Sequence, residues 1–250
     1  VAAVNKNFLF TAKLYRAFTH SSIAVMEPTS AATIRPTDED EARTREGLDA
    51  LAGEGRLGAL LIQFPVSFKN TSLNREYLDR LLRQFIEYPR VVEVRHSSWN
   101  DAATLTSFAQ KNVGFCNIDQ PQLGSSLAPT KHVTEAIGYV RLHGRNYEQW
   151  FDPDNRNDRY NYLYNQHELE DWKERIESIA ERPQTTFVIA NNCVEGKAGV
   201  NALELKAMLS GKRVLAPATL IEKYPELRKI ADPAEDSDEN DGGPRLPLRA

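Results

Sequence analysis

Ionisable side chains recur at every second position near the ends of short apolar segments. Glu93 and Arg95 alternate with valines in one such segment, and Arg141 and His143 alternate with apolar residues in another. Arginine binds anions through a planar fork of donors, whereas glutamate and histidine can transfer protons. These residue types predict a site that binds an anion and carries groups capable of acid–base chemistry.

The candidate site residues fall into two sets. The candidate acid and base groups are carboxylates and histidines at or just after such segments, namely Glu93, His96, His143 and Asp119. The candidate ligand-binding groups are cations, amides and one aromatic, namely Lys13, Arg95, Arg141, Arg145, Gln63, Asn191 and Tyr160. Arg16 would add a further cation beside Lys13. A structural alternative stays open, because inward-facing charges must be paired and a buried Glu–Arg pair would serve that purpose alone.

A divalent metal is the less favoured alternative for this site. Five possible ligands fall near the ends of the same segments, namely His20, Glu93, His96, Asp119 and His143. Three or four of them converging would suit Zn²⁺ or Mn²⁺. However, no HExxH or similar local pattern is present, and the neighbouring arginines would repel a cation. No cofactor is identified from the sequence.

An aromatic-rich connection runs from 144 to 165 and includes Tyr147, Trp150, Phe151, Tyr160, Tyr162 and Tyr164. Loops of this length are commonly functional lids, and aromatic rings can stack on a sugar or a base. Packing of these rings on the rim of the protein is an equal alternative.

The overall composition narrows the partners of the chain. Its 250 residues carry a formal net charge of −4, with 41% hydrophobic and 26% charged residues. A protein that binds duplex DNA usually has a basic balance, so the total charge does not support a nucleic-acid partner. We expect a small anionic ligand. No apolar run approaches the about 20 residues of a membrane helix, and nothing indicates an oligomeric state.

Two cysteines, Cys116 and Cys193, lie in or beside apolar runs. They predict buried thiols in a reducing compartment rather than a disulfide framework, so a cytoplasmic location is expected.

Short apolar strands alternate with amphipathic stretches along most of the chain. The predicted strands are 8–13, 58–63, 91–95, 113–118, 139–142 and 187–190; the predicted helices are 37–51, 73–86, 102–111, 168–180 and 198–209. Regular β/α alternation predicts a parallel sheet, because parallel neighbours need crossover helices. We expect one domain over 1–230, closing with a short helix near Leu220, and a disordered acidic and Pro-rich tail over 231–250.

The choice between a barrel and an open sheet depends on the faces of the strands. An open parallel sheet is covered on both faces and has continuously apolar strands. Here Glu93 and Arg95, Arg141 and His143, and Asn117 and Asp119 instead alternate with apolar residues. We interpret this as a polar interior at the mouth of a TIM-type (β/α) barrel. No GxGxxG or GxxxxGK[ST] pattern supports a nucleotide fold.

Seven segments together resemble one family. They are KLYRAFTH (13–20), GALLIQFPVSF (58–68), VVEVRHSSW (91–99), NIDQP (117–121), YVRLHGRN (139–146), RYNYLYNQHELEDW (159–172) and NNCVEGKAGVNALELK (191–206). In order and spacing they are similar to the YecE-like proteins of domain-of-unknown-function family 72. The resemblance covers about 7–210. It implies a TIM-type barrel with functional groups at the strand ends, and no established reaction.

The chain departs from that family in two places. Family members begin with a strand, a Gly-Trp motif and a second strand carrying Glu, Asn and Tyr, none of which is present. About six of the eight strands of such a barrel are therefore expected, incomplete at the N-terminus. The second departure is Cys193, where the family more often has a polar residue.

Two functions follow as hypotheses. The first is an enzyme, with hydrolysis of a phosphorylated or nucleotide or sugar substrate as the default reaction. In it Arg95 and Arg141 bind the anion, and Glu93, His96 and His143 supply acid and base groups. The second is a non-catalytic module that binds an anionic ligand or single-stranded nucleic acid.

Overall fold

A computed structural model describes residues 7–20, 36–150 and 158–234 of the chain. Six parallel strands form one sheet in the order β1-β2-β3-β4-β5-β6. The strands are β1 (Phe10–Lys13), β2 (Leu57–Gln63), β3 (Arg90–Glu93), β4 (Val113–Asp119), β5 (Ile137–Leu142) and β6 (Thr185–Ala190). The predicted strands are confirmed, with ends that differ by at most two residues. Because all six run in the same direction, their carboxyl ends meet at one edge of the sheet.

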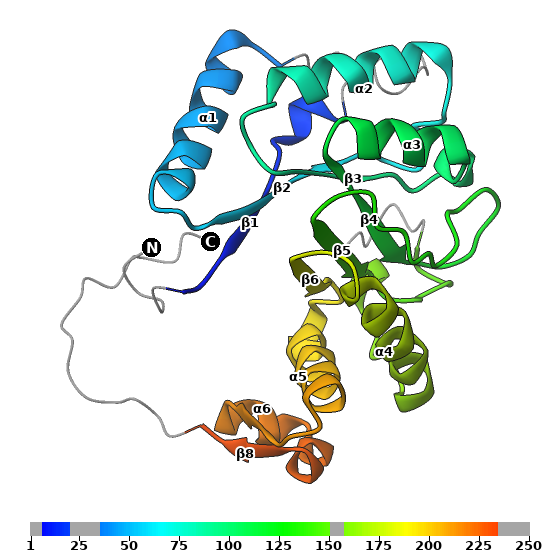
Figure 1. Cartoon of the computed structure of the whole chain (residues 1–250). Helices are drawn as coiled ribbons and strands as arrows, with labels where there is room; N and C mark the ends of the chain where they lie inside the picture. The colour runs from blue at the N-terminus through cyan, green and yellow to red at the C-terminus, as the bar shows by residue number, and fades with distance from the viewer. Residues whose placement is uncertain (1–6, 21–35, 151–157, 235–250) are drawn as a thin grey trace.

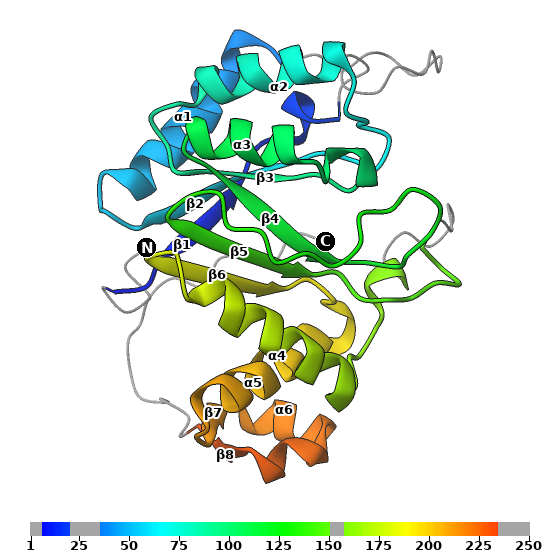
Figure 2. The same ribbon diagram turned by 45° about the vertical axis from the view of Figure 1, so that its right-hand side comes forward.

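Crossover helices join the strands. They are α1 (Asp38–Ala52), α2 (Ser72–Gln84), α3 (Ala102–Gln110) and α4 (Gln166–Ala180), with α5 (Lys197–Ser210) following β6. Helices α1 to α3 lie along the half of the curled sheet formed by β1 to β4, and α4 and α5 lie along the half formed by β5 and β6 (Figure 1 and Figure 2). The helices thus cover the convex face and leave the concave face to the interior.

Local capping explains where two of these helices begin. The side chain of Thr37 accepts a hydrogen bond from the backbone N–H of Asp40, and the carboxylate of Asp40 accepts one from the backbone N–H of Thr37. Asn165 and Glu168 form the same reciprocal pair at the start of α4. Such capping boxes satisfy otherwise unpaired N–H groups of the first helical turn.

The sheet curls into a half-barrel. The hydroxyl of Tyr139 on β5 donates to the hydroxyl of Thr11 on β1 at 3.0 Å, although the two strands are separated by three others. The ring of Phe187 on β6 lies against Gly58 on β2. These cross-sheet contacts show that the two ends of the sheet approach each other across the concave face. The structure therefore has a curled, six-stranded parallel half-barrel, as the strand alternation indicated.

The C-terminal part of the described chain forms a small separate layer. Strands β7 (Val214–Ala216) and β8 (Ala231–Pro233) pair in parallel and flank α6 (Ala218–Lys223). The prediction of a disordered tail over 231–250 is therefore wrong for its first three residues, which form β8 and pair with β7. Residues 235–250 lie outside the described part. None of the helices that the structure describes is both long enough and apolar enough to span a bilayer.

Gly58 provides a test of the curl. The register between β1 and β2 skips Gly58, and a Cβ placed there would overlap the ring of Phe187. We expect Gly58→Ala to lower the free energy of unfolding by about 1–3 kcal/mol, because overpacking displaces the ring or the strand. Urea unfolding of the variant gives the measurement.

Two controls separate the overlap from a general effect of the added methyl. Gly47 lies within α1 with open space around its Cβ position, so Gly47→Ala should raise stability by up to about 1 kcal/mol. Adding Gly58→Ala to a Phe187→Leu background should cost far less than it does in the original chain. Equal costs in both backgrounds would show that β2 and β6 do not meet.

Candidate functional site

Strand register decides which side chains share the concave face. Residues paired between parallel strands point to the same side, so Gln63 on β2 lies level with Glu93 on β3. Ile118 on β4 is likewise level with Arg141 on β5, whose neighbour on β6 is Ile189. The concave face at the carboxyl ends therefore carries a polar patch within an apolar lining.

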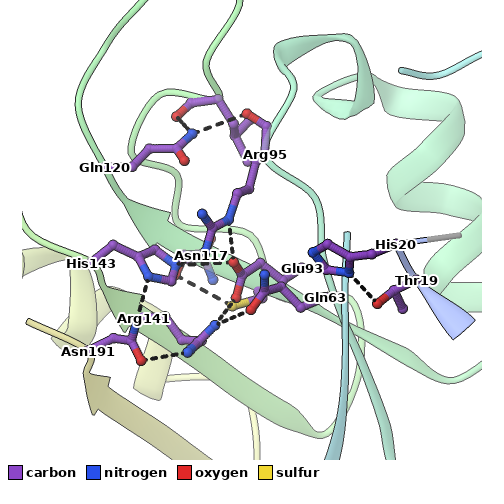
Figure 3. A network of polar contacts seen from close by, with 12 residues as sticks. Thr19, His20, Gln63, Glu93, Arg95, Asn117, Gln120, Arg141, His143 and Asn191 are labelled. Atoms are coloured by element: carbon purple, nitrogen blue, oxygen red, sulfur yellow. Dashed lines mark hydrogen bonds and ion pairs between the residues drawn. The ribbon is translucent and has the colours of Figure 1, made fainter. Parts of the chain in front are cut away.

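A buried carboxylate lies at the centre of this patch (Figure 3). Glu93 is fully buried and accepts hydrogen bonds from two guanidinium groups. Arg95 Nε donates to Oε1 at 2.8 Å, and Arg141 Nη1 donates to Oε2. Arg141 also donates to Gln63 Oε1 at 3.1 Å and to Asn191 Oδ1 at 2.8 Å. We call this set, with His143, the Glu93 cluster.

The protonation state of His143 follows from its neighbours. Arg141 can only donate, so it fixes the Asn191 amide with Oδ1 towards Arg141 and the NH₂ group towards His143 Nδ1, at 3.0 Å. Nδ1 must then accept. The proton of a neutral ring consequently lies on Nε2, which donates to Glu93 Oε1 at 3.1 Å, whereas Arg95 Nη2 lies farther from the same nitrogen, at 3.3 Å. A second proton on Nδ1 would face the amide N–H, so the ring is held neutral.

The electrostatics of the cluster agree with this assignment. Burial acts to raise the pKa of Glu93, but His143, Arg141 and Arg95 outweigh it and hold that pKa well below its usual value. Burial, followed by the charge of Arg95, lowers the pKa of His143 from 6.5 to about 3. Glu93 is therefore ionised and His143 neutral at pH 7.

Asp119 does not join the Glu93 cluster. Its register partner is Leu142, so it points to the helix-covered face, and Asn117 does so as well. Asp119 accepts from Arg145 Nε at 2.8 Å, and Arg145 Nη1 donates to Glu168 on α4 at 3.0 Å. The prediction that Asn117 and Asp119 face the shared interior is wrong. Arg145 is likewise engaged on the outer side.

His96 also lies elsewhere. It follows Arg95 and therefore has the opposite orientation, and its ring caps the short helix Ser97–Trp99 through the N–H of Ser98 at 3.1 Å. The expected role of His96 in a shared cavity is not supported by this placement. The prediction that both cysteines are buried is wrong for Cys193, which is exposed, and confirmed for Cys116.

The five metal-ligand candidates do not converge. Asp119 and His96 point away from Glu93 and His143, and the two arginines occupy the oxygens of Glu93. Within the described ranges no three His, Cys, Asp or Glu side chains lie close enough to hold a metal ion. The residues present therefore do not fit the metal site considered from the sequence.

Two further cations and a histidine lie at the β1 side of the cluster. Lys13 ends β1, Arg16 begins the short helix Arg16–Phe18, and His20 follows it. Burial lowers the pKa of Lys13, and the charges of Arg141, Arg95 and Arg16 lower it further while Glu93 opposes them. Lys13 thus lies within electrostatic reach of the cluster, although no acidic side chain of the described residues forms an ion pair with it or with Arg16.

Tyr160 lies beside the cluster. Its ring centroid is 6.4 Å from that of His143 and 6.4 Å from that of Trp150. Tyr162 and Tyr164 instead pack in the core with α4, and Tyr162 donates to Glu168 at 2.7 Å. The aromatic loop therefore divides between the two expected roles; Phe151 lies outside the described residues.

The neighbouring asparagines also divide. Asn191 contacts Arg141 and His143, whereas Asn192 donates to the backbone oxygen of Tyr162 and to Asn201 and so anchors the loop, each at 2.8 Å. Sequence reasoning overlooked one member of the concave face. Continuing the β3–β4 register places Cys116 level with Glu93. The spacing of apolar residues in the sequence does not reveal this register.

The fold agrees with the comparisons to known proteins. The family model described as "Protein of unknown function DUF72" matches residues 1–223. The chain belongs to the DUF72 family. It is 33% identical over 164 residues to the UPF0759 protein YunF of Bacillus subtilis (strain 168), a match covering 62% of this chain and 58% of YunF. The chain thus spans less than two thirds of the length of that relative.

Solved DUF72 structures have the same fold. A DUF72 family protein (TM1631) from Thermotoga maritima MSB8 superposes with a TM-score of 0.72 at 31% identity, covering 84% of this chain and 76% of that one. A DUF72 family protein (EF0366) from Enterococcus faecalis V583 gives a TM-score of 0.72 at 27% identity, with 84% and 77% covered. The family assignment supplies a fold and carries no activity with it.

Glu93→Gln tests the charge balance of the cluster. The substitution keeps the shape but leaves Arg95 and Arg141 without their buried counter-charge. We expect a loss of about 3–5 kcal/mol in the free energy of unfolding, measured by chemical denaturation. Glu177→Gln, which removes an exposed pair with Lys173, should cost less than about 0.5 kcal/mol. Similar costs for the two variants would contradict the buried pairing.

The stability of the chain should also depend on pH through His143. Its pKa is about 3 in the folded protein and 6.5 when unperturbed, so the unfolded chain binds more protons in between. The contribution of His143 to the free energy of unfolding is therefore fully present above pH 6.5. It falls as the pH drops towards 3, by up to about 1.4 kcal/mol per pH unit. His20, whose pKa is lowered to about 4, acts in the same direction.

Unfolding free energies of His143→Gln between these pH values give the measurement. The slope against pH should be shallower than in the original chain, even if the variant is less stable throughout. His167→Gln, at an exposed position of α4, should retain the original slope. An unchanged slope in His143→Gln would mean that this ring titrates normally.

Proposed function

We propose that the Glu93 cluster, with Lys13 and Arg16, forms a binding site for a small anion. The observation that supports it is the charge balance: three cations, Lys13, Arg95 and Arg141, lie within electrostatic reach of the single carboxylate Glu93, and Arg16 lies within reach of Lys13 and His20. Arg95 and Arg141 donate to Glu93, and no acidic side chain of the described residues forms an ion pair with Lys13 or Arg16. An excess of positive charge at a partly buried position favours an anionic ligand.

The position of the cluster supports the same proposal. The half-barrel is consistent with part of a TIM-type barrel, and barrels of that type carry their functional groups at the carboxyl ends of the strands. Glu93 ends β3, and Arg141 and His143 lie at the end of β5. This argument is an analogy at the level of the fold.

Binding is supported better than acid–base catalysis. A general base needs an accessible lone pair and a pKa near the working pH. Both oxygens of Glu93 accept from arginines, and both ring nitrogens of His143 are engaged by Asn191 and Glu93. Glu93 and His143 therefore act structurally, by holding the arginines in place. The hydrolase hypothesis loses its acid and base pair, and the binding-module hypothesis is favoured.

Thermal shift with inorganic phosphate tests the proposal. A ligand that binds only the folded chain raises the Tm in a concentration-dependent manner. Phosphate also stabilises proteins through exclusion from their surfaces, so the informative quantity is the difference between variants. We expect the Lys13→Ala/Arg16→Ala double variant to lose the saturable part of the shift. Neither side chain belongs to the hydrophobic core, so the variant should fold normally.

Lys173→Ala serves as the matched control, because Lys173 lies on α4 and pairs only with Glu177 among the described residues. It should keep the full shift. Equal phosphate-induced shifts in the original chain and the double variant would contradict the anion site.

A further inference from the structure

His20 lies at the edge of the cluster with one ring nitrogen engaged. Its Nδ1 is 2.8 Å from the hydroxyl of the buried Thr19, and Figure 3 shows the ring directed towards Glu93. Nε2 has no hydrogen-bond partner among the described residues. A donor or acceptor at Nε2 is therefore available to a ligand that approaches Lys13 and Arg16.

The two histidines of the region differ in whether they can accept a second proton. Nδ1 of His143 faces an amide N–H, which can only donate. Nδ1 of His20 faces a hydroxyl, which can donate to a neutral ring or accept from a protonated one. His20 can therefore switch its charge without breaking its contact to Thr19, whereas His143 cannot.

The groups around His20 are mostly cationic. Lys13 comes from β1, Arg16 from the adjacent short helix, and Arg95 and Glu93 from the end of β3. Burial, followed by the charges of Lys13, Arg16 and Arg95, lowers the pKa of His20 to about 4, and Glu93 opposes the shift. A ligand that neutralises these cations removes most of the unfavourable charge.

The hydrogen-bond donors of Lys13, Arg16 and His20 and the net charge of the cluster distinguish between classes of anion. Lys13, Arg16, Arg95 and Arg141 carry four positive charges against the one negative charge of Glu93, so an excess of three positive charges remains. A carboxylate supplies one charge and two coplanar oxygens. A phosphoryl group supplies close to two charges and three acceptor oxygens directed outward, which matches donors that arrive from β1, the short helix and His20.

We propose that the cluster takes up a tetrahedral dianion, the phosphoryl group of free phosphate or of a phosphate monoester, together with one proton on His20. The proposal rests on the proposed function and names its ligand class. The proton comes from solvent and converts the imidazole to imidazolium, so that Nδ1–H donates to Thr19 and Nε2–H donates to a ligand oxygen. Binding is accordingly stronger at lower pH, as long as the ligand stays doubly charged.

Sulfate is the probe for the proton, because it is a tetrahedral dianion that does not titrate in this range. Isothermal titration at about pH 5.5, above the pKa of free His20, in two buffers of different ionisation enthalpy gives the number of protons taken up. We expect uptake of a large fraction of one proton by the original chain. His20→Gln should lose this uptake and bind sulfate several-fold more weakly.

Two controls accompany the sulfate titration. His96→Gln should keep the uptake, since His96 caps the helix Ser97–Trp99 and lies away from the cluster. Acetate should bind the original chain at least about tenfold more weakly than sulfate, the effect of losing one charge-assisted contact. Titrations of inorganic phosphate and a phosphate monoester at about pH 7.5, where both are mostly dianions, identify the source. Tighter binding of the ester indicates a phosphorylated metabolite, and equal binding indicates the free anion.

The outcomes separate the two proposals. If no anion binds, the proposed function and this inference both fail. If acetate binds as tightly as sulfate, or if sulfate binds without proton uptake that depends on His20, the anion site stands and the inference is overturned.

Discussion

A single ionised carboxylate, buried without access to water, sets the requirements for the rest of the strand-end region. Removing a charge from water costs several kcal/mol unless partners replace the lost hydration. Glu93 meets this requirement with Arg95 and Arg141, and each arginine then needs further acceptors. Gln63 and Asn191 supply them for Arg141. The residues of four different strands or strand ends are thereby tied together by one charge.

The two histidines show how the surroundings of a ring decide its chemistry. His143 is neutral and hydrogen-bonds to both Asn191 and Glu93, so it contributes rigidity rather than proton transfer. His20 has a ring nitrogen, Nε2, without a hydrogen-bond partner in the described part of the chain, and its hydroxyl neighbour Thr19 tolerates both protonation states. A prediction of acid–base function from residue type alone would assign the chemistry to His143, whereas the hydrogen bonds favour His20 as the group that changes charge.

Much of the fold and part of the site follow from the sequence. The alternation of β-strands and helices predicted the parallel sheet, and alternation with apolar residues predicted that Glu93, Arg95, Arg141 and His143 share a face. The same argument failed on β4 (Val113–Asp119), because the side chains on both faces of this strand are buried. Polarity alone therefore does not show which face points into the half-barrel. Only the pairing of Ile118 with Arg141 decides it. Asp119 therefore ended on the outer face, with Arg145 and α4 as its partners.

The ionised Glu93 and the neutral His143 are the central claim, and nuclear magnetic resonance of the His143 ring tests it most directly. We predict ¹⁵N shifts of the neutral Nε2–H tautomer that stay constant from pH 7 down to about 4. A ring that titrates near its unperturbed pKa of 6.5, or that carries its proton on Nδ1, would contradict the account.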